Sequence, residues 1–371
     1  MAEIIQTIFN SQKEFNSDAE EFYRNYWTQS GVVKAETFAK YRAIIDKFFP
    51  QGLSGKKVLE IGVGGEGGTL LQLMEHNDVH GLDVSDSAIS NCHRFGINVT
   101  KANLDSDTIP FNSDYFDVVF AFEVFEHFAN PQHAVEEIRR VLKADGIFIS
   151  SIPGTFTYHW PRLFYAGLFE KDNYTDFLTA NEFKVTCLND WMIRNRYGNY
   201  AISQDITSWS WYFYTQKLGS ADAEGYFDSG RYFWNKRNEL GLRTRPIEAI
   251  DLFRKSLNIA PGNTVTQLYM AHALLYRAIN GDHNEFMMEV EKIITHIKTS
   301  AGSDKVEYLS RLLLINVEAN RFRLQLLNPD DYVQLKMQLN QTSGAAAIIE
   351  EIEYEEEINK HLTACSSDDG K

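Results

Sequence analysis

The chain has 371 residues, 44% hydrophobic and 23% charged, which is typical of a soluble globular protein with about two domains. Acidic residues outnumber basic ones by 51 to 36, and no basic patch offsets the net charge of -15, so we expect no nucleic-acid partner. The three cysteines lack C-x-x-C spacing, which argues against a disulfide framework or a structural zinc site. Without a basic, apolar leader or an apolar run near about 18 residues, we expect a cytoplasmic protein with no membrane partner.

Residues 1–50 are expected to form a helical cap. Apolar and aromatic side chains recur at helical spacings in two stretches, at about 15–27 and 38–48. The second stretch stops at Pro50-Gln-Gly52, a sequence that favours the end of a helix.

Residues 51–220 are expected to form an α/β domain. Short apolar strands alternate with helical stretches, and this alternation predicts a doubly wound parallel sheet. The expected strands are 58–61, 79–83, 98–100, 116–121 and 146–150, and the expected helices are 69–74, 85–95 and 131–142. We interpret residues 151–220, which are rich in aromatic side chains, as the last strands plus an insertion that binds the substrate. The run 209–214 predicts strand packing, with stacking on a sugar or planar ring as the alternative.

A glycine-rich turn follows the first strand. Gly62-Val-Gly64-Gly-Glu-Gly67 fits G-x-G-x-x-G, and Asp83 ends the next strand 21 residues after Gly62. A carboxylate there can accept both hydroxyls of a ribose, as nicotinamide dinucleotides and S-adenosylmethionine both require. Glu60 separates the two cofactors, because an acid at this edge would repel a pyrophosphate and suits a cationic amino-acid group. The turn therefore favours S-adenosylmethionine.

These residues resemble the class I S-adenosylmethionine-dependent methyltransferases. Glu60, Gly62 and Gly64 match the first motif, (Glu/Asp)-x-Gly-x-Gly-x-Gly, whereas its next glycine falls on Glu66. Residues 81–85, 104–111, 116–127 and 138–146 are similar to the motifs that follow, in the same order. The resemblance implies a Rossmann-like, seven-stranded sheet and S-adenosylhomocysteine as the product of the cofactor.

The resemblance also implies the cofactor contacts. Asp83 would bind the ribose hydroxyls, Asp105 the adenine amino group, and Val84 and Leu104 would flank the ring. Gly65 and Glu123 complete the expected set of cofactor-binding residues.

The methyl acceptor is expected beyond the fourth strand, where Glu123-Val-Phe-Glu126-His127 reaches the carboxyl edge of the sheet. His127 and Glu126 are the first candidates to remove or orient an acceptor proton, and His159, within 155–160, is the second candidate base. The arrangement is similar to quinone-biosynthesis and small-RNA O-methyltransferases that hold a divalent metal. A metal here would use Glu123, Glu126 and His127, although we expect none.

We therefore expect transfer of a methyl group to oxygen of a small molecule, or to a sugar or glycan hydroxyl. A metal-dependent O-methyltransferase of a catechol or quinone is one alternative. In another, the C-terminal helices form an interaction or dimerisation module, through which the chain binds a second copy or a protein partner.

Residues 221–343 are expected to form a helical domain. Ala249, Phe253 and Pro261 resemble the second helix of a tetratricopeptide repeat, with further helical stretches at 264–279, 283–298 and 304–327; a simple helical bundle is the alternative. Residues 344–371 are rich in glutamate and are expected to form a solvated, partly disordered acidic tail.

Overall fold

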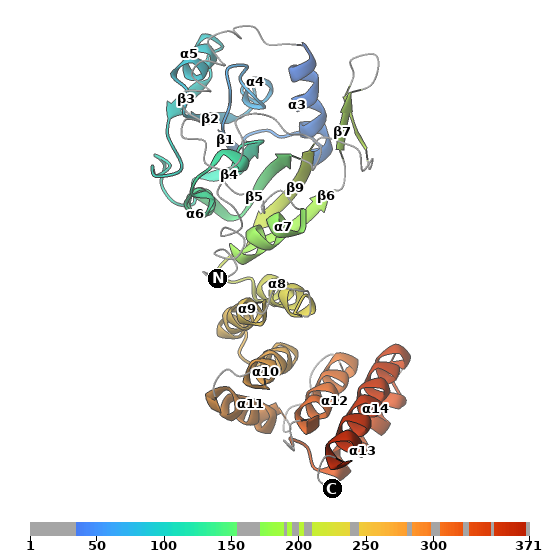
Figure 1. Ribbon diagram of the computed structural model, residues 1–371. Coiled ribbons are helices and arrows are strands. Elements are labelled where there is room, and N and C mark those ends of the chain that lie inside the picture. Colours follow the sequence, from blue (N-terminus) through green and yellow to red (C-terminus); the bar gives the residue numbers. More distant parts are fainter. Residues whose placement is uncertain are drawn as a thin grey trace. The chain divides into compact units, whose positions relative to one another are not determined.

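The computed structural model describes residues 35–153, 171–188, 191–194, 200–203, 210–237, 245–279, 284–297, 305–321, 326–342 and 345–368. The chain divides into two compact units, Met1–Ser220 and Ala221–Lys371, which are described separately below (Figure 1). The first expected helix, at about 15–27, lies outside the described residues, and so does the segment around His159.

The first unit is built on a seven-stranded sheet with the order β3-β2-β1-β4-β5-β9-β6 (Figure 1). Strands β1 to β5 are parallel, and β9 runs antiparallel to both β5 and β6. This topology confirms the predicted doubly wound, Rossmann-like sheet. The strands are β1 (Lys57–Ile61), β2 (Asp78–Asp83), β3 (Asn98–Lys101), β4 (Phe116–Phe122), β5 (Leu142–Pro153), β6 (Phe183–Leu188) and β9 (Ser210–Lys217), with a separate hairpin of β7 (Trp191–Arg194) and β8 (Tyr200–Ser203).

Helices cover both faces of this sheet. They are α3 (Ala35–Phe48), α4 (Leu70–Leu73), α5 (Asp86–Arg94), α6 (Pro131–Val141) and α7 (Lys171–Ala180), with a short 3-10 helix, η1 (Phe125–His127). Ser85 caps α5, because its hydroxyl accepts a hydrogen bond from the Ala88 N–H. Proline in the first turn of α6 follows the cap residue Asn130, whose side chain accepts from the His133 N–H.

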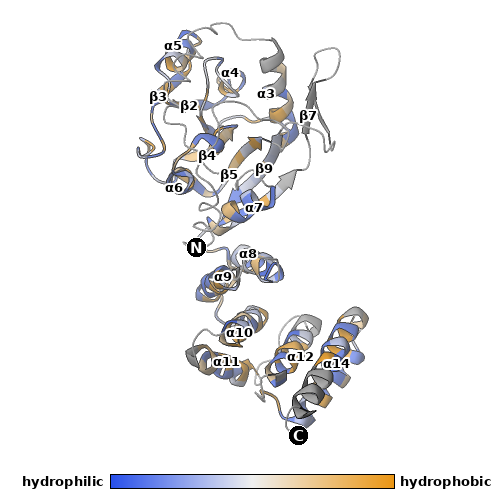
Figure 2. Cartoon of the chain, in the orientation of Figure 1, coloured by the Kyte–Doolittle hydropathy of each residue, from blue (hydrophilic) through white to orange (hydrophobic). Residues whose placement is uncertain are grey.

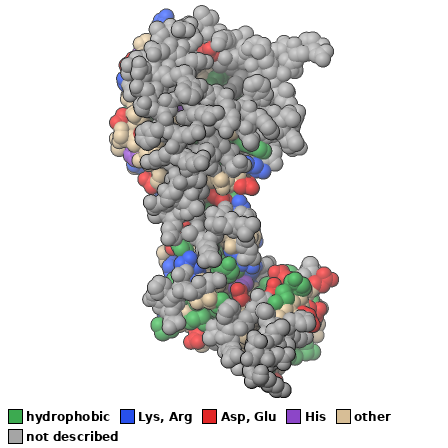
Figure 3. Space-filling model, viewed as in Figure 1, with side chains coloured by type: hydrophobic (Ala, Val, Ile, Leu, Met, Phe, Trp, Pro, Cys, Tyr) green, Lys and Arg blue, Asp and Glu red, His purple; other side chains and the backbone are tan. Residues whose placement is uncertain are grey.

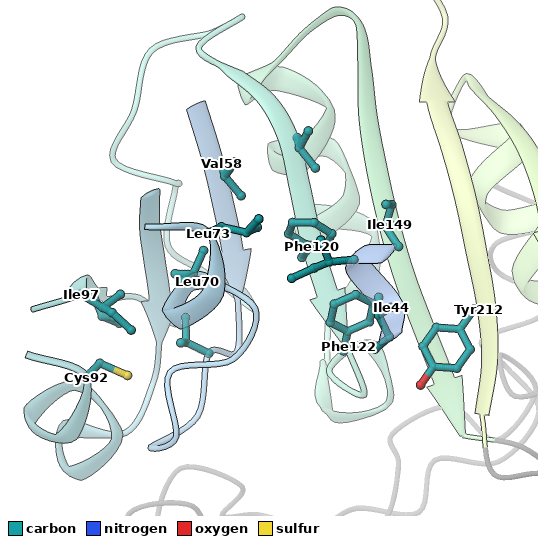
Figure 4. Close-up of a cluster of buried hydrophobic side chains, with 14 residues drawn as sticks. Ile44, Val58, Leu70, Leu73, Cys92, Ile97, Phe120, Phe122, Ile149 and Tyr212 are labelled. Atoms are coloured by element: carbon teal, nitrogen blue, oxygen red, sulfur yellow. The ribbon is translucent and has the colours of Figure 1, made fainter. Parts of the chain in front are cut away.

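The two faces bury different side chains. On one face, Ile44 of α3 lies against Phe120 and Phe122 of β4, beside residues of α4, α5 and β9 (Figure 4). On the other face, Tyr174 of α7 packs against Phe213 of β9, with ring centroids 4.8 Å apart. The aromatic run that ends at residue 214 therefore packs within the sheet from Ser210 onwards, as the simpler interpretation predicts.

The second unit is helical throughout its described part. Its helices are α8 (Ala223–Asn235), α9 (Arg245–Ile259), α10 (Thr264–Ile279), α11 (Asn284–Ile297), α12 (Lys305–Arg321), α13 (Pro329–Asn340) and α14 (Ala346–Asp368). A Cβ atom on Gly230 of α8 would lie 2.6 Å from the Phe253 ring, so this glycine permits the close packing of α8 on α9. The tetratricopeptide likeness of this region stays a prediction.

The expected acidic tail is wrong for the described residues, because 346–368 form helix α14. Ile348, Ile349 and Ile352 pack against the buried side of α12, and the Ile352 side chain is fully buried. Its glutamates alternate with this apolar stripe (Figure 2), and Glu356 accepts hydrogen bonds from Tyr332 and Lys336 of α13. The expected tail was inferred from the many acidic residues alone, without the isoleucines that recur at helical spacing.

None of the helices in the described part of the chain has both the length and the apolar character needed to cross a bilayer.

Candidate active site

The glycine-rich turn joins β1 to α4 and depends on left-handed backbone. Gly62, Gly64 and Gly67 have φ values of +69°, +68° and +82°. A Cβ atom on Gly62 would lie 2.4 Å from Cγ2 of Val124, two residues beyond the end of β4. Both the backbone angle and the lack of space therefore require glycine at position 62.

Glu60 is buried at the end of β1 and anchors this turn. Its Oε2 accepts hydrogen bonds of 2.7 Å from both the N–H and the hydroxyl of Thr69, and one of 3.3 Å from the Leu70 N–H. A Cβ atom on Gly68 would lie 2.4 Å from Oε1 of the same carboxylate. Glu60 thus holds the start of α4, a role that the sequence analysis missed, and its contact with a cofactor stays a prediction.

Asp83 and Cys92 fix the peptide groups of Gly64 from two sides. The Asp83 carboxylate accepts hydrogen bonds from the Gly64 N–H at 2.9 Å and from the Ser85 N–H at 2.8 Å. The Cys92 thiol donates to the Gly64 carbonyl, with 3.1 Å between sulfur and oxygen. Burial, together with the charges of Asp83 and Glu60, raises the pKa of the thiol to about 12, so it stays protonated and able to donate. Sequence analysis considered Cys92 only as a disulfide or zinc residue and missed this contact.

The residues expected around the adenine lie along the same edge of the sheet. Leu104 is buried, Val84 is half-buried at the end of β2, and Asp105 is half-buried. One carboxylate oxygen of Asp105 accepts a hydrogen bond from the Asn130 N–H at 2.9 Å. Desolvation raises the pKa of Asp105 in spite of this bond. Asp105 therefore also holds the loop after η1.

Glu123 stands at the carboxyl end of β4 in a conformation that few non-glycine residues adopt. Its φ is +52°, and backbone of this kind costs roughly 1–3 kcal/mol. The Ser151 hydroxyl donates to the Glu123 carboxylate at 2.7 Å, and Ser151 lies opposite Tyr212 in the pairing of β5 with β9. Strained residues of this kind cluster at functional sites.

Two tyrosines from distant elements, Tyr41 and Tyr212, pack against the ring of Phe122 next to this carboxylate, with ring centroids 6.1 Å apart in each pair. Desolvation raises the pKa of Tyr41, on α3, and the charges of Glu60, Glu66 and Glu123 raise it further. Desolvation and the charge of Glu123 likewise raise the pKa of Tyr212. The edge of the sheet thus gathers three carboxylates around neutral phenols, a setting that favours a positively charged ligand group. The sequence indicated Tyr41 only as part of the helical stretch at about 38–48.

Glu126 and His127 are brought together on η1. The Glu126 side chain is fully buried, the His127 side chain is 11% exposed, and 3.6 Å separates Oε1 of Glu126 from Nε2 of His127. A buried carboxylate at this distance can stabilise a protonated imidazole, so the pair can accept a proton from an acceptor hydroxyl. In the described part of the chain no three His, Cys, Asp or Glu side chains are grouped to hold a metal ion.

Residues 59–150 match a family model described as a methyltransferase domain. The chain is 30% identical over 161 residues to a sterol 24-C-methyltransferase of Schizosaccharomyces pombe, a match covering 38% of this chain and 41% of that protein. It is 34% identical over 116 residues to a ubiquinone biosynthesis O-methyltransferase of Azoarcus, a match covering 28% of this chain and 48% of that protein. The chain thus spans less than half the length of either relative.

Among solved structures, a protein of Thermotoga maritima described as an S-adenosylmethionine-dependent methyltransferase aligns with a TM-score of 0.41 and 16% identity. The alignment covers 53% of this chain and 97% of that one.

Proposed function

With residues 59–150 matching a methyltransferase domain, we propose that the protein is an S-adenosylmethionine-dependent methyltransferase acting on a hydroxyl oxygen of a small molecule or sugar. The observation that carries the proposal is the placement of Glu60, Asp83 and Glu123 at the carboxyl ends of β1, β2 and β4, beside the glycine turn. Such a setting suits a ligand that carries an ammonium and a sulfonium but no phosphate. When bound, this cofactor supplies an electrophilic methyl group.

The chain's own residues fit the cofactor. Gly62 and Gly64 bring the backbone of the turn close to the site, and the Asp83 carboxylate keeps lone pairs for ribose hydroxyls beside its two backbone bonds. Glu123 faces the same edge through its bond to Ser151. We assign these contacts from the geometry of the turn and from the similarity of these residues to the methyltransferase motifs.

The Glu126–His127 pair supports transfer to oxygen, because a histidine beside a buried carboxylate can take up a hydroxyl proton. The ubiquinone biosynthesis relative is named for O-methylation and the sterol relative for C-methylation. A metal-dependent reaction on a catechol or quinone is the alternative, and sensitivity to a chelator distinguishes it.

The test measures S-adenosylhomocysteine formation with a panel of catechols, hydroquinones, other phenols and sugars, with and without EDTA. We expect at least one hydroxyl acceptor to raise the rate above the acceptor-free rate, and EDTA to leave that rate unchanged. Amines and thiols are assayed in parallel, and product formation with these but with none of the hydroxyl acceptors would contradict transfer to oxygen.

With such an acceptor, His127→Gln should lower kcat by about 10²–10⁴-fold, because the general base is lost. The KM for S-adenosylmethionine should stay within about twofold. His76→Gln, at an exposed site after α4, is the matched control and should keep the wild-type kcat. An unchanged kcat in His127→Gln would remove His127 from the proposal.

A further inference from the structure

The helical unit contains a partly open cavity of about 180 Å³, separate from the site described above. It is formed by the C-terminal end of α8 together with α10, α12 and α14. Its charged lining consists of Arg237, Arg311, Glu318, Glu351 and Glu355, with His272 among them. Figure 3 shows acidic and basic side chains next to one another on the described surface of this unit.

One carboxylate of the cavity, that of Glu318, is hydrogen-bonded to His272. His272 Nε2 lies 2.5 Å from the Glu318 carboxylate, and Nδ1 lies 3.4 Å from Nη1 of Arg311. Burial lowers the pKa of His272, which fits a neutral ring that donates from Nε2 and accepts at Nδ1. Glu318 and His272 therefore form an internal hydrogen-bonded pair.

The other charges lie on different helices according to their sign. The guanidinium of Arg237 stacks over Trp234 at 4.2 Å, and that of Arg311 stacks over Tyr269 at 3.9 Å. Both arginines line the same cavity, and burial lowers the pKa of Arg237 although the charge of Glu318 opposes the shift. Glu351 and Glu355 face the cavity from one turn of α14.

The charged side chains that line the cavity are half-buried or exposed, so they border it at the surface of the unit. The adjoining core of α12, α13 and α14 is apolar, built from Leu309, Leu313 and Ile352. A concave site with a few converging polar groups is typical of ligand binding.

We propose that this cavity binds a small zwitterion, an α-amino acid with a short apolar side chain. Its carboxylate would pair with the guanidiniums of Arg237 and Arg311, which suit a planar carboxylate. Its ammonium would face Glu351 and Glu355, and its side chain would contact the apolar part of the lining, Leu314 and Val317. The proposal concerns binding and does not depend on the methyl-transfer reaction.

The experiment titrates the full chain with L-leucine by calorimetry and follows thermal unfolding. We expect one site per chain and a raised unfolding temperature. Two analogues of similar size, 4-methylpentanoate and 3-methylbutylamine, each lack one charge and should bind at least tenfold more weakly. Failure of L-leucine to bind, or equal binding of 4-methylpentanoate, would overturn the proposal.

Arg311→Gln and Glu351→Gln should each weaken the binding of L-leucine at least tenfold. Arg254→Gln is the matched control, because Arg254 pairs with Glu289 at the surface, and it should bind L-leucine as the wild type does. Glu351 is exposed, so its variant keeps the test valid if Arg311→Gln fails to fold. Wild-type affinity in Glu351→Gln would overturn the proposal. Titration with S-adenosylmethionine reports separately on the first unit.

Discussion

At the residue scale, several contacts fix the turn after β1. Only some of them can be predicted from the sequence. The glycines and Asp83 stand in a recognisable spacing, so they could be predicted. Cys92, Ser151 and Tyr212 could not, because each reaches the site from a separate element and none belongs to a local pattern. A sequence shows which residues alternate along one strand, but not which side chains meet across several.

Gly62 gives the sharpest test at this scale. Gly62→Ala adds a Cβ atom against Val124 at a φ of +69°, and we expect a loss of roughly 2–5 kcal/mol in unfolding free energy. Gly52→Ala is the matched control, because Gly52 has a φ of +81° but no atom within 4 Å. Urea unfolding of both variants separates backbone strain from collision, and equal losses would contradict the close contact with Val124.

At the element scale, the Glu137 carboxylate ties α6 to the chain before β4. It accepts hydrogen bonds from Arg140 and, at 2.7 Å, from the Ile109 N–H. The Arg140 bond holds the pKa of Glu137 below its usual range. A depressed carboxyl pKa stabilises the fold above the unfolded pKa, and that stabilisation is lost as pH falls through the folded value.

Glu137→Gln should therefore cost roughly 1–3 kcal/mol at pH 7, because a charged hydrogen-bond network is broken. The difference from the wild type should shrink below about pH 4.5, where the wild-type carboxyl also becomes protonated. Urea unfolding at several pH values measures this, with the exposed Glu136→Gln as control. A difference that does not change with pH would contradict the role of the charge.

Helix α14 illustrates where composition misleads at this scale. Its sequence combines many glutamates with isoleucines at helical spacing, and only the isoleucines decide that it folds against α12. Strands β1 and β4 of the first unit were predictable because each is a nearly continuous apolar run.

Ile352→Ala should lower the unfolding free energy of the helical unit by roughly 2–5 kcal/mol, because it leaves a cavity under α14. The neighbouring Tyr354 is 66% exposed, so Tyr354→Ala should change the unfolding free energy by less than about 1 kcal/mol. Chemical unfolding followed by circular dichroism compares the two variants. If both variants were as stable as the wild type, the interpretation of residues 344–371 as a solvated tail would be supported instead.

At the scale of the whole molecule, two compact units carry separate candidate sites. The first gathers the glycine turn, Asp83 and the carboxylates around Tyr41 at the carboxyl edge of the sheet. The second holds the mixed-charge cavity between its helices. The fold class follows from the alternation of strands and helices along the sequence, whereas the cavity depends on four helices spread over more than a hundred residues.

The central claim is that the first unit binds S-adenosylmethionine through the glycine turn and Asp83. Calorimetric titration of the full chain with S-adenosylmethionine and S-adenosylhomocysteine tests it directly. We expect one site of micromolar affinity, about -8 kcal/mol, weakened at least tenfold in Asp83→Ala and unchanged in the exposed control Asp86→Ala. If neither ligand bound while a nicotinamide dinucleotide did, the assignment of the turn would be wrong.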